Sequence, residues 1–269
     1  MRSVKFCHYA CLGIAMLGLT LLPSCSGDDS DESPKSEQPL AVTATVEHGN
    51  DYNSKIDSVK VEALNENTQN TLIITSARYV NGGFSLTLPY PLEEKYLAGN
   101  VVDMNQILSG VSVSDKTARA VAADFYGYKN GNKQEDANFI LGGFVSSLSG
   151  TSLKFEVTQA SIVYCDKPVK LTGSFTEELD GMNVTFTTDV SWSKGWNIVY
   201  FTQKGSINAL TGIPSMTGSL TVNKPSYSMK WYCGDDFQQA LNSGLGVSGL
   251  AASLNKLNKL KPALFRLEK

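Results

Sequence analysis

Few side chains in this 269-residue chain could carry out acid–base or nucleophilic chemistry. The chain has two histidines, and only His48 lies beyond the apolar N-terminal segment. Catalytic triads, Cys–His pairs and His-rich zinc sites would therefore all depend on His48. The stretch His48–Asn53 is rich in turn-forming residues, which favours a solvated loop histidine. The sequence predicts no catalytic residue, no metal site and no cofactor.

A pair of carboxylates is the remaining catalytic possibility. Glu177 and Glu178 precede Asp180-Gly181, and two facing carboxylates can hydrolyse a glycosidic bond. Asp180-Gly181 favours a tight hairpin turn, where acidic side chains are usually solvated. We therefore expect a non-enzymatic protein and keep a glycan-acting hydrolase as an alternative.

Two cysteines in the body of the chain could form a disulfide. Cys165 and Cys233 each end a strand-like segment, Ser161–Cys165 and Met229–Cys233. A bridge between them would close a long loop and stabilise the fold by roughly 4 kcal/mol in the chain-entropy model. Two buried free thiols are the alternative, and the sequence leaves both possibilities open.

The N-terminus has the pattern of a secretory signal peptide. Arg2 and Lys5 precede an apolar run, Tyr9–Leu22, that is too short to cross a bilayer as a permanent helix. Residues 1–24 are therefore predicted to be removed and are excluded from the fold. Without Arg2 and Lys5 the net charge falls from −3 to about −5. The chain is then weakly acidic and lacks the basic field that binding to nucleic acid requires.

The segment that follows shows a family resemblance. Leu22-Pro23-Ser24-Cys25 resembles the bacterial lipobox, and the acidic run Asp28–Glu32 is similar to the export signal of Bacteroides-type surface lipoproteins. The resemblance implies a lipidated Cys25 that anchors the protein to the outer membrane, because several acyl chains bind a bilayer stably. It also implies exposure at the cell surface, with the periplasmic face as the alternative. Residues 25–40 would be the lipidated cysteine and a flexible linker.

The body of the chain has the alternation of half-buried strands. Ser58–Ala63 and Phe84–Leu88 alternate apolar with polar residues, which is typical of antiparallel sheets with one solvated face. Asn81-Gly82 and Asn130-Gly131 predict tight hairpin turns. Trp196–Phe201 is apolar on both faces and predicts a central strand. We therefore predict an all-β fold of antiparallel β-sandwich modules.

The domain organisation is less clear from the sequence. A loop-like stretch, Ala98–Asp115, suggests a first β module at 41–108 and a second at 109–233, although a crossover within one sandwich is the alternative. A C-terminal loop and helix would occupy 234–269. Leucines spaced three or four residues apart between Leu250 and Leu260 predict a short amphipathic helix there.

Aromatic residues near turns are the candidate binding residues. Tyr126 and Tyr128 lead into Asn130-Gly131, and Trp231 and Tyr232 precede Gly234. Aromatic faces stack on sugar rings, although packing in the core is the commoner role for each of these residues. The sequence therefore predicts a surface binding or adhesion module for a glycan or a surface protein. A structural component of a surface complex is a further alternative.

Overall fold

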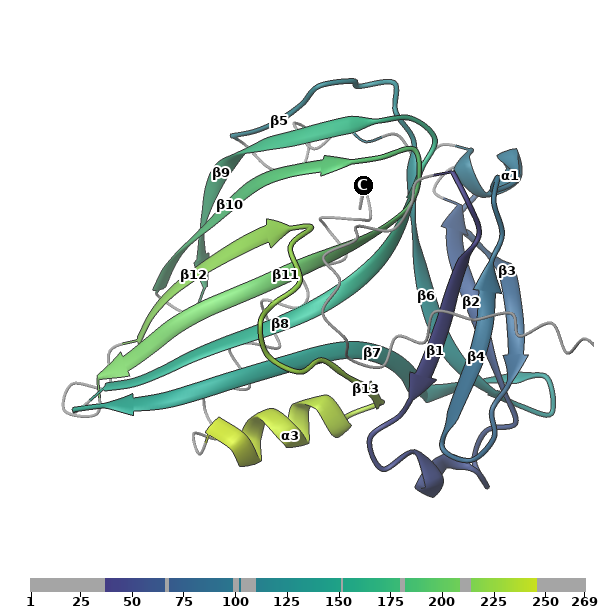
Figure 1. The fold of residues 1–269 in the computed structure, drawn as a ribbon, viewed down its shortest axis with the longest axis horizontal. Coiled ribbons are helices and arrows are strands. Elements are labelled where there is room, and N and C mark those ends of the chain that lie inside the picture. The colour runs from purple at the N-terminus through teal and green to yellow at the C-terminus, as the bar shows by residue number, and fades with distance from the viewer. Residues whose placement is uncertain are drawn as a thin grey trace, which may run out of the picture.

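The computed structural model describes residues 37–65, 68–98, 102, 110–150, 152–179, 182–208 and 214–245. The predicted signal peptide, Cys25, the turn Asp180-Gly181 and the predicted helix at Leu250–Leu260 lie outside these residues. Strands make up most of the described chain (Figure 1). The all-β fold with a short helix towards the C-terminus is therefore confirmed.

The elements have the following bounds. The strands are β1 (Leu40–Thr45), β2 (Ser58–Asn65), β3 (Asn70–Arg78), β4 (Gly83–Leu88), β5 (Val111–Val113), β6 (Ala120–Lys129), β7 (Asn132–Ser149), β8 (Ser152–Cys165), β9 (Val169–Leu179), β10 (Met182–Trp192), β11 (Gly195–Asn208), β12 (Pro214–Thr221) and β13 (Lys230–Cys233). The helices are α1 (Glu94–Leu97), α3 (Asp236–Leu245) and the 3-10 helix η1 (Gly49–Tyr52). No described helix is long and apolar enough to cross a bilayer.

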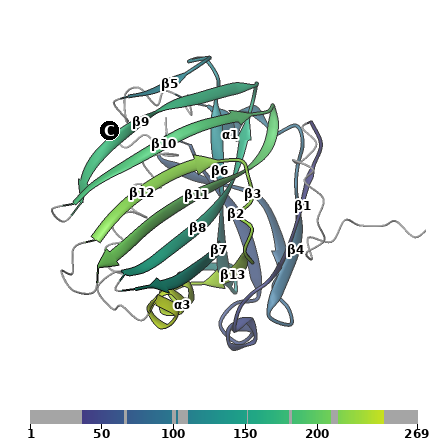
Figure 2. The same ribbon diagram turned by 60° about the vertical axis from the view of Figure 1, so that its left-hand side comes forward.

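Two sheets contain these strands. The larger has eleven strands in the order β3-β2-β6-β7-β8-β11-β12-β10-β9-β5, with β13 paired to β7. It is strongly curved, and the strands from β7 to β5 form one continuous bent surface (Figure 2). Its ladders are antiparallel except for β10 and β12, which are parallel. The smaller sheet pairs β1 with β4 and packs against one end of the larger sheet (Figure 1).

Two groups of buried side chains form the core. The large-sheet cluster lies on one face of the curved sheet and includes Val163, Cys165, Phe186, Phe201 and Leu220. The sandwich cluster lies between the two sheets and includes Val42, Val61, Phe84, Phe125 and Tyr164. Both clusters draw on strands of the larger sheet.

Strands β8 and β11 are buried on both faces where the two clusters meet. In β8, Val163 and Cys165 belong to the large-sheet cluster, whereas Ile162 and Tyr164 belong to the sandwich cluster. This division follows from the period of two along a strand. In β11, Trp196 also contributes to the sandwich cluster. The predicted central position of this strand is confirmed, because β11 pairs with β8 on one side and β12 on the other.

The Asn-Gly turns form as predicted, but one of the predicted hairpins does not. Asn130 and Gly131 have φ values of 51° and 81° and connect β6 to β7, which are paired. Asn81 also has a positive φ, yet β3 and β4 belong to different sheets. The predicted hairpin of these two strands is therefore wrong. The chain crosses there between the two layers, because the apolar face of β4 packs into the sandwich cluster.

The division into two modules stays a prediction, since Ser109 lies outside the described residues. Strands from both predicted modules nevertheless share one hydrogen-bonded sheet, because β2 pairs with β6 along Ser58–Glu62. The helix in the described C-terminal part is α3, which starts soon after β13. Phe237 and Leu241 of α3 pack into the large-sheet cluster.

Candidate functional site

Two of the four predicted binding aromatics lie close together. Tyr126 and Tyr128 are on the same side of β6, because they are two residues apart in a strand. Tyr126 is half-buried, and Tyr128 is 9% exposed. Their side of β6 faces away from Phe125, which packs in the sandwich cluster.

The structure buries Tyr232 in the core and packs the partly buried Trp231 against it. The Trp231 ring centroid lies 5.3 Å from that of Phe125 and 5.6 Å from that of Phe84. Tyr232 is 6% exposed and its ring lies 5.1 Å from that of Phe237. Consecutive residues of β13 thus point into different clusters, and the structure does not bring either ring to Tyr126. Packing accounts for both residues.

A buried carboxylate lies beside the two tyrosines. Glu62 of β2 is 3% exposed. Its Oε1 accepts a hydrogen bond of 2.7 Å from the Tyr128 hydroxyl, and its Oε2 lies 2.7 Å from Nζ of Lys133. A carboxylate is stable out of water only when it is paired and hydrogen-bonded. These two contacts meet that requirement.

Two lysines lie against the tyrosine rings. Nζ of Lys133 is 3.2 Å from the Tyr126 ring centroid, and Nζ of Lys60 is 3.9 Å from that of Tyr128. A cation over an aromatic face is attracted by the ring quadrupole. Lys133 therefore links Glu62 to Tyr126 and fixes the orientation of that ring.

A second carboxylate completes the group. Asp124 is the residue of β6 directly opposite Glu62, and Tyr126 is directly opposite Lys60. Directly opposite residues have Cβ atoms about 4.5–5.5 Å apart. We call Lys60, Glu62, Asp124, Tyr126, Tyr128 and Lys133 the Glu62 site.

Burial keeps the Tyr128 hydroxyl protonated. Loss of solvation, followed by the hydrogen bond to Glu62, raises the pKa of Tyr128 to about 12. Tyr128 is therefore a neutral donor to Glu62 at every pH of biological interest. Because both oxygens of Glu62 are engaged, the arrangement positions side chains for recognition more readily than it supplies a free acid or base.

The site offers a ligand both stacking and polar contacts. The partly exposed Tyr126 ring is an apolar surface of the kind on which a sugar ring stacks. Lys60 and Lys133 are donors and Asp124 is an acceptor within the same group of side chains. Sequence reasoning found the tyrosines from the adjacent turn but missed the lysines and carboxylates. Those residues meet only through the β2–β6 and β6–β7 pairings.

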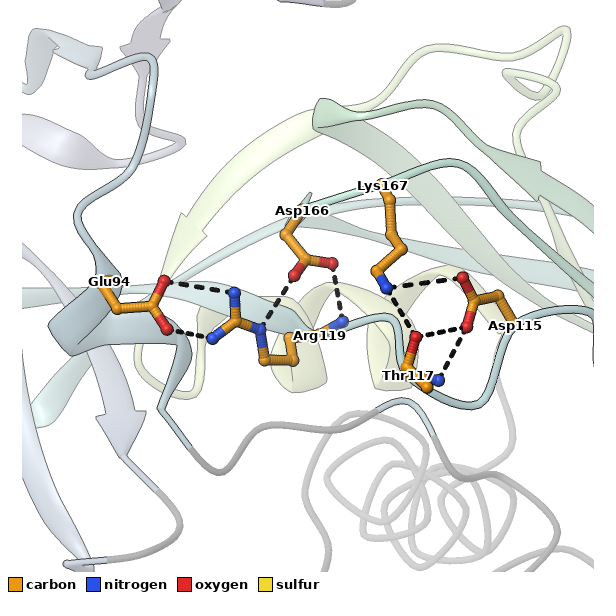
Figure 3. A network of polar contacts seen from close by, with 6 residues as sticks. All are labelled: Glu94, Asp115, Thr117, Arg119, Asp166 and Lys167. Atoms are coloured by element: carbon orange, nitrogen blue, oxygen red, sulfur yellow. Dashed lines mark hydrogen bonds and ion pairs between the residues drawn. The ribbon is translucent and has the colours of Figure 1, made fainter.

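A separate polar network lies at the other end of β6 (Figure 3). Nε of Arg119 lies 2.8 Å from Oδ2 of Asp166, and its guanidinium also contacts Glu94 of α1. Next to it, Nζ of Lys167 donates to Oγ1 of Thr117 at 2.6 Å. Asp115 accepts from both the backbone N–H and the hydroxyl of Thr117, and these bonds hold the pKa of Asp115 below its usual range. The network joins α1 to two loops and serves as structural support.

Of the two possibilities left open for Cys165 and Cys233, the structure shows free thiols and no disulfide. Cys165 and Cys233 are buried free thiols. They end β8 and β13, which lie on opposite sides of β7, so at least two strand spacings of about 4.8 Å separate them. The Cα atoms of a disulfide lie within about 6.8 Å. The two thiols also belong to different clusters, Cys165 to the large-sheet cluster and Cys233 to the sandwich cluster.

Other candidate chemistry finds no site in the described part of the chain. There, no group of three or more His, Cys, Asp and Glu side chains could hold a metal ion. The side chains of Glu177 and Glu178 lie outside the description, as does Cys25. Comparisons with models of protein families, with curated proteins and with solved structures find no match.

Proposed function

We propose that this chain is a lipid-anchored surface protein that binds a glycan, or a glycan-bearing cell-surface ligand, at the Glu62 site without catalysing a reaction. The observation that carries this proposal is the Tyr126 ring. It is partly exposed, and Lys133 lies 3.2 Å from its centroid while also binding the buried Glu62. A ring held in this way loses little conformational freedom when a sugar stacks on it.

The anchor follows from the resemblance at Leu22–Cys25, and the position of the site is compatible with it. The described chain starts at Glu37, which pairs with Lys194 at the turn between β10 and β11. That turn lies at the same end of the sheet as Ala120, since Cys165 pairs with both Gly195 and Ala120. Tyr126 is six residues further along β6, about 20 Å from that end. The Glu62 site therefore lies along the sheet from the end at which the described chain begins, and not at that end.

Glycan binding is tested with purified protein on immobilised glycans. We expect Tyr126→Ala to abolish binding, because stacking on the ring is lost. Tyr126→Phe keeps the ring and should bind nearly as well as the parent protein. Equal binding by all three proteins would place the ligand elsewhere and contradict the proposed site.

The hydrolase alternative gives a different result in the same experiment. A hydrolase would release reducing sugar from the bound glycan, and replacement of a catalytic carboxylate by its amide would stop that release. If the parent protein releases reducing sugar and either Glu62→Gln or Glu177→Gln does not, the protein is an enzyme and the proposal of a non-catalytic binding protein is wrong. We expect no release by the parent protein.

The anchor is tested separately. Cells grown with labelled palmitate should incorporate the label into the parent protein and not into Cys25→Ala, which should leave the membrane fraction. A Cys25→Ala variant that still sediments with membranes would contradict the lipid anchor. Protease treatment of intact cells distinguishes surface exposure from the periplasmic face.

A further inference from the structure

The edge strand β3 has apolar side chains on the face that meets the sandwich cluster and one, Ile73, on the opposite face. Leu72, Ile74 and Ala77 pack against the sandwich cluster and are only partly buried. Ile73 points to the opposite face and is 40% exposed. Among the described residues, β3 pairs with β2 alone and forms one end of the larger sheet.

In the described part of the chain, no strand pairs with the outer edge of β3. In an antiparallel pair, alternate residues direct their N–H and C=O groups away from the partner strand. Among the described residues, β3 forms its ladder with β2 alone. One acceptor is occupied, since the Tyr96 hydroxyl donates to the Ile73 carbonyl at 2.7 Å. The segment Ile74–Arg78 lies beyond that contact.

The usual protections of an edge strand are few in β3. Exposed edges commonly carry lysine or proline, or are very short. The opposite end of the sheet follows that rule, because β5 has three residues, whereas β3 has nine and contains neither lysine nor proline. One irregularity in the β2–β3 register occurs between Val61 and Glu62, opposite Ile74. It leaves Thr75–Arg78 in regular pairing with β2.

We propose that β3 is a docking edge for an extended segment of another protein, which adds a strand to the sheet beside Ile74–Arg78. Side chains at alternate positions of that segment would be apolar and would cover Ile74 and Ala77. The segment would also carry a carboxylate for Arg78, which is exposed and has no ion pair among the described residues.

The charge of β3 argues against a second copy as the partner. Asn70–Arg78 contains no acidic residue, so two copies paired through β3 would leave both Arg78 side chains without a carboxylate. This inference is independent of the Glu62 site, and the failure of either proposal leaves the other intact.

The experiment uses the full-length protein and synthetic nine-residue peptides with valine and threonine at alternate positions. One peptide carries glutamate near its end, the second carries lysine there, and the third has proline at its centre. Hydrogen exchange is measured with each peptide at millimolar concentration. We expect slower exchange of amides in Ile74–Arg78 with the glutamate peptide. Its affinity should exceed that of the lysine peptide by about two- to fivefold, as for an exposed ion pair.

Arg78→Glu is the matched variant, since Arg78 is exposed and outside both clusters. It should reverse the preference between the glutamate and lysine peptides without loss of folding. If none of the peptides slows amide exchange in β3, the proposal is wrong. It is also wrong if the proline peptide slows that exchange as much as the glutamate peptide does. A dimer that protects β3 without any peptide would show that the partner is a second copy and would also overturn it.

Discussion

The ring of Phe186 in β10 lies over Gly218 in β12, so closely that a Cβ atom at residue 218 would be 2.0 Å from the ring. The same ring stacks between two others. Its centroid is 4.9 Å from that of Phe175 and 5.5 Å from that of Phe201, with interplanar angles of 15° in both pairs. The row of rings crosses β12 because glycine leaves room for it.

Gly218→Ala should therefore destabilise the protein. The added methyl group would force Phe186 out of the stack, and overpacking of a core typically costs about 1–3 kcal/mol. Urea unfolding measures the change. Thr217→Ala on the exposed face of the same strand is the control and should have little effect. Equal midpoints for the two variants would show that the large-sheet cluster adapts without cost.

Removal of Lys133 should also destabilise the fold, because it leaves the buried carboxylate of Glu62 without its cation. For Lys133→Met we expect a loss of about 2 kcal/mol in the free energy of unfolding. Glu62→Gln in the same chain should recover most of that loss, since the charge is then gone. Additive effects of the two substitutions in a double-mutant cycle would argue against the coupling.

The two body thiols should resist alkylation in the folded protein. We expect iodoacetamide to modify Cys165 and Cys233 only after unfolding, and a non-reducing mass measurement to show both thiols free. A mass lower by that of two hydrogen atoms, together with no alkylation after unfolding, would show that Cys165 and Cys233 form a disulfide and would contradict this prediction.

Stability should fall at alkaline pH. Burial raises the pKa of Cys165 to about 11 and that of Cys233 to about 12, from the ordinary thiol value of 9.0. Because the folded pKa values are the higher ones, the stabilisation is complete below pH 9 and is lost as the pH rises towards 12. Replacing both cysteines by alanine should flatten this decline in urea midpoints between pH 9 and 11. An unchanged slope would assign the decline to the buried tyrosines.

Arg119→Lys should loosen α1 although the charge is kept. Lysine cannot reproduce the contacts of the guanidinium with both Asp166 and Glu94. We expect a loss of about 1 kcal/mol and faster amide exchange in Glu94–Leu97. Lys170→Met, which removes an exposed pair with Asp189, is the control and should leave α1 unaffected. Slow exchange in both variants would mean that packing of Tyr96 and Leu97 alone holds α1.

Local patterns predicted the strands well because the period of two decides which residues are buried. Val184, Phe186, Val190 and Trp192 share one parity in β10, and all four are buried. The alternation of buried and exposed residues along one strand depends only on residues close together in the sequence, so it can be predicted from the sequence alone.

The pairing of strands that are far apart in the sequence could not be predicted from this alternation. The positive φ at Asn81 was predictable, but the sequence does not show that β4 leaves the sheet of β3 after the turn. The same limit applies to the Glu62 site. The polar positions of Lys60 and Glu62 were visible in β2, whereas their neighbours on β6 depend on a register between segments about sixty residues apart. No local signal specifies that register.

Strand β8 contributes side chains to both clusters, so each cluster depends on the same backbone. Removal of either one would uncover apolar side chains on a strand that the other still requires. We therefore expect a single cooperative unfolding transition, in which tryptophan fluorescence and far-ultraviolet circular dichroism change at the same urea concentration. For the same reason, a fragment that begins at β6 would expose Ile162, Tyr164 and Trp196 and should not fold by itself.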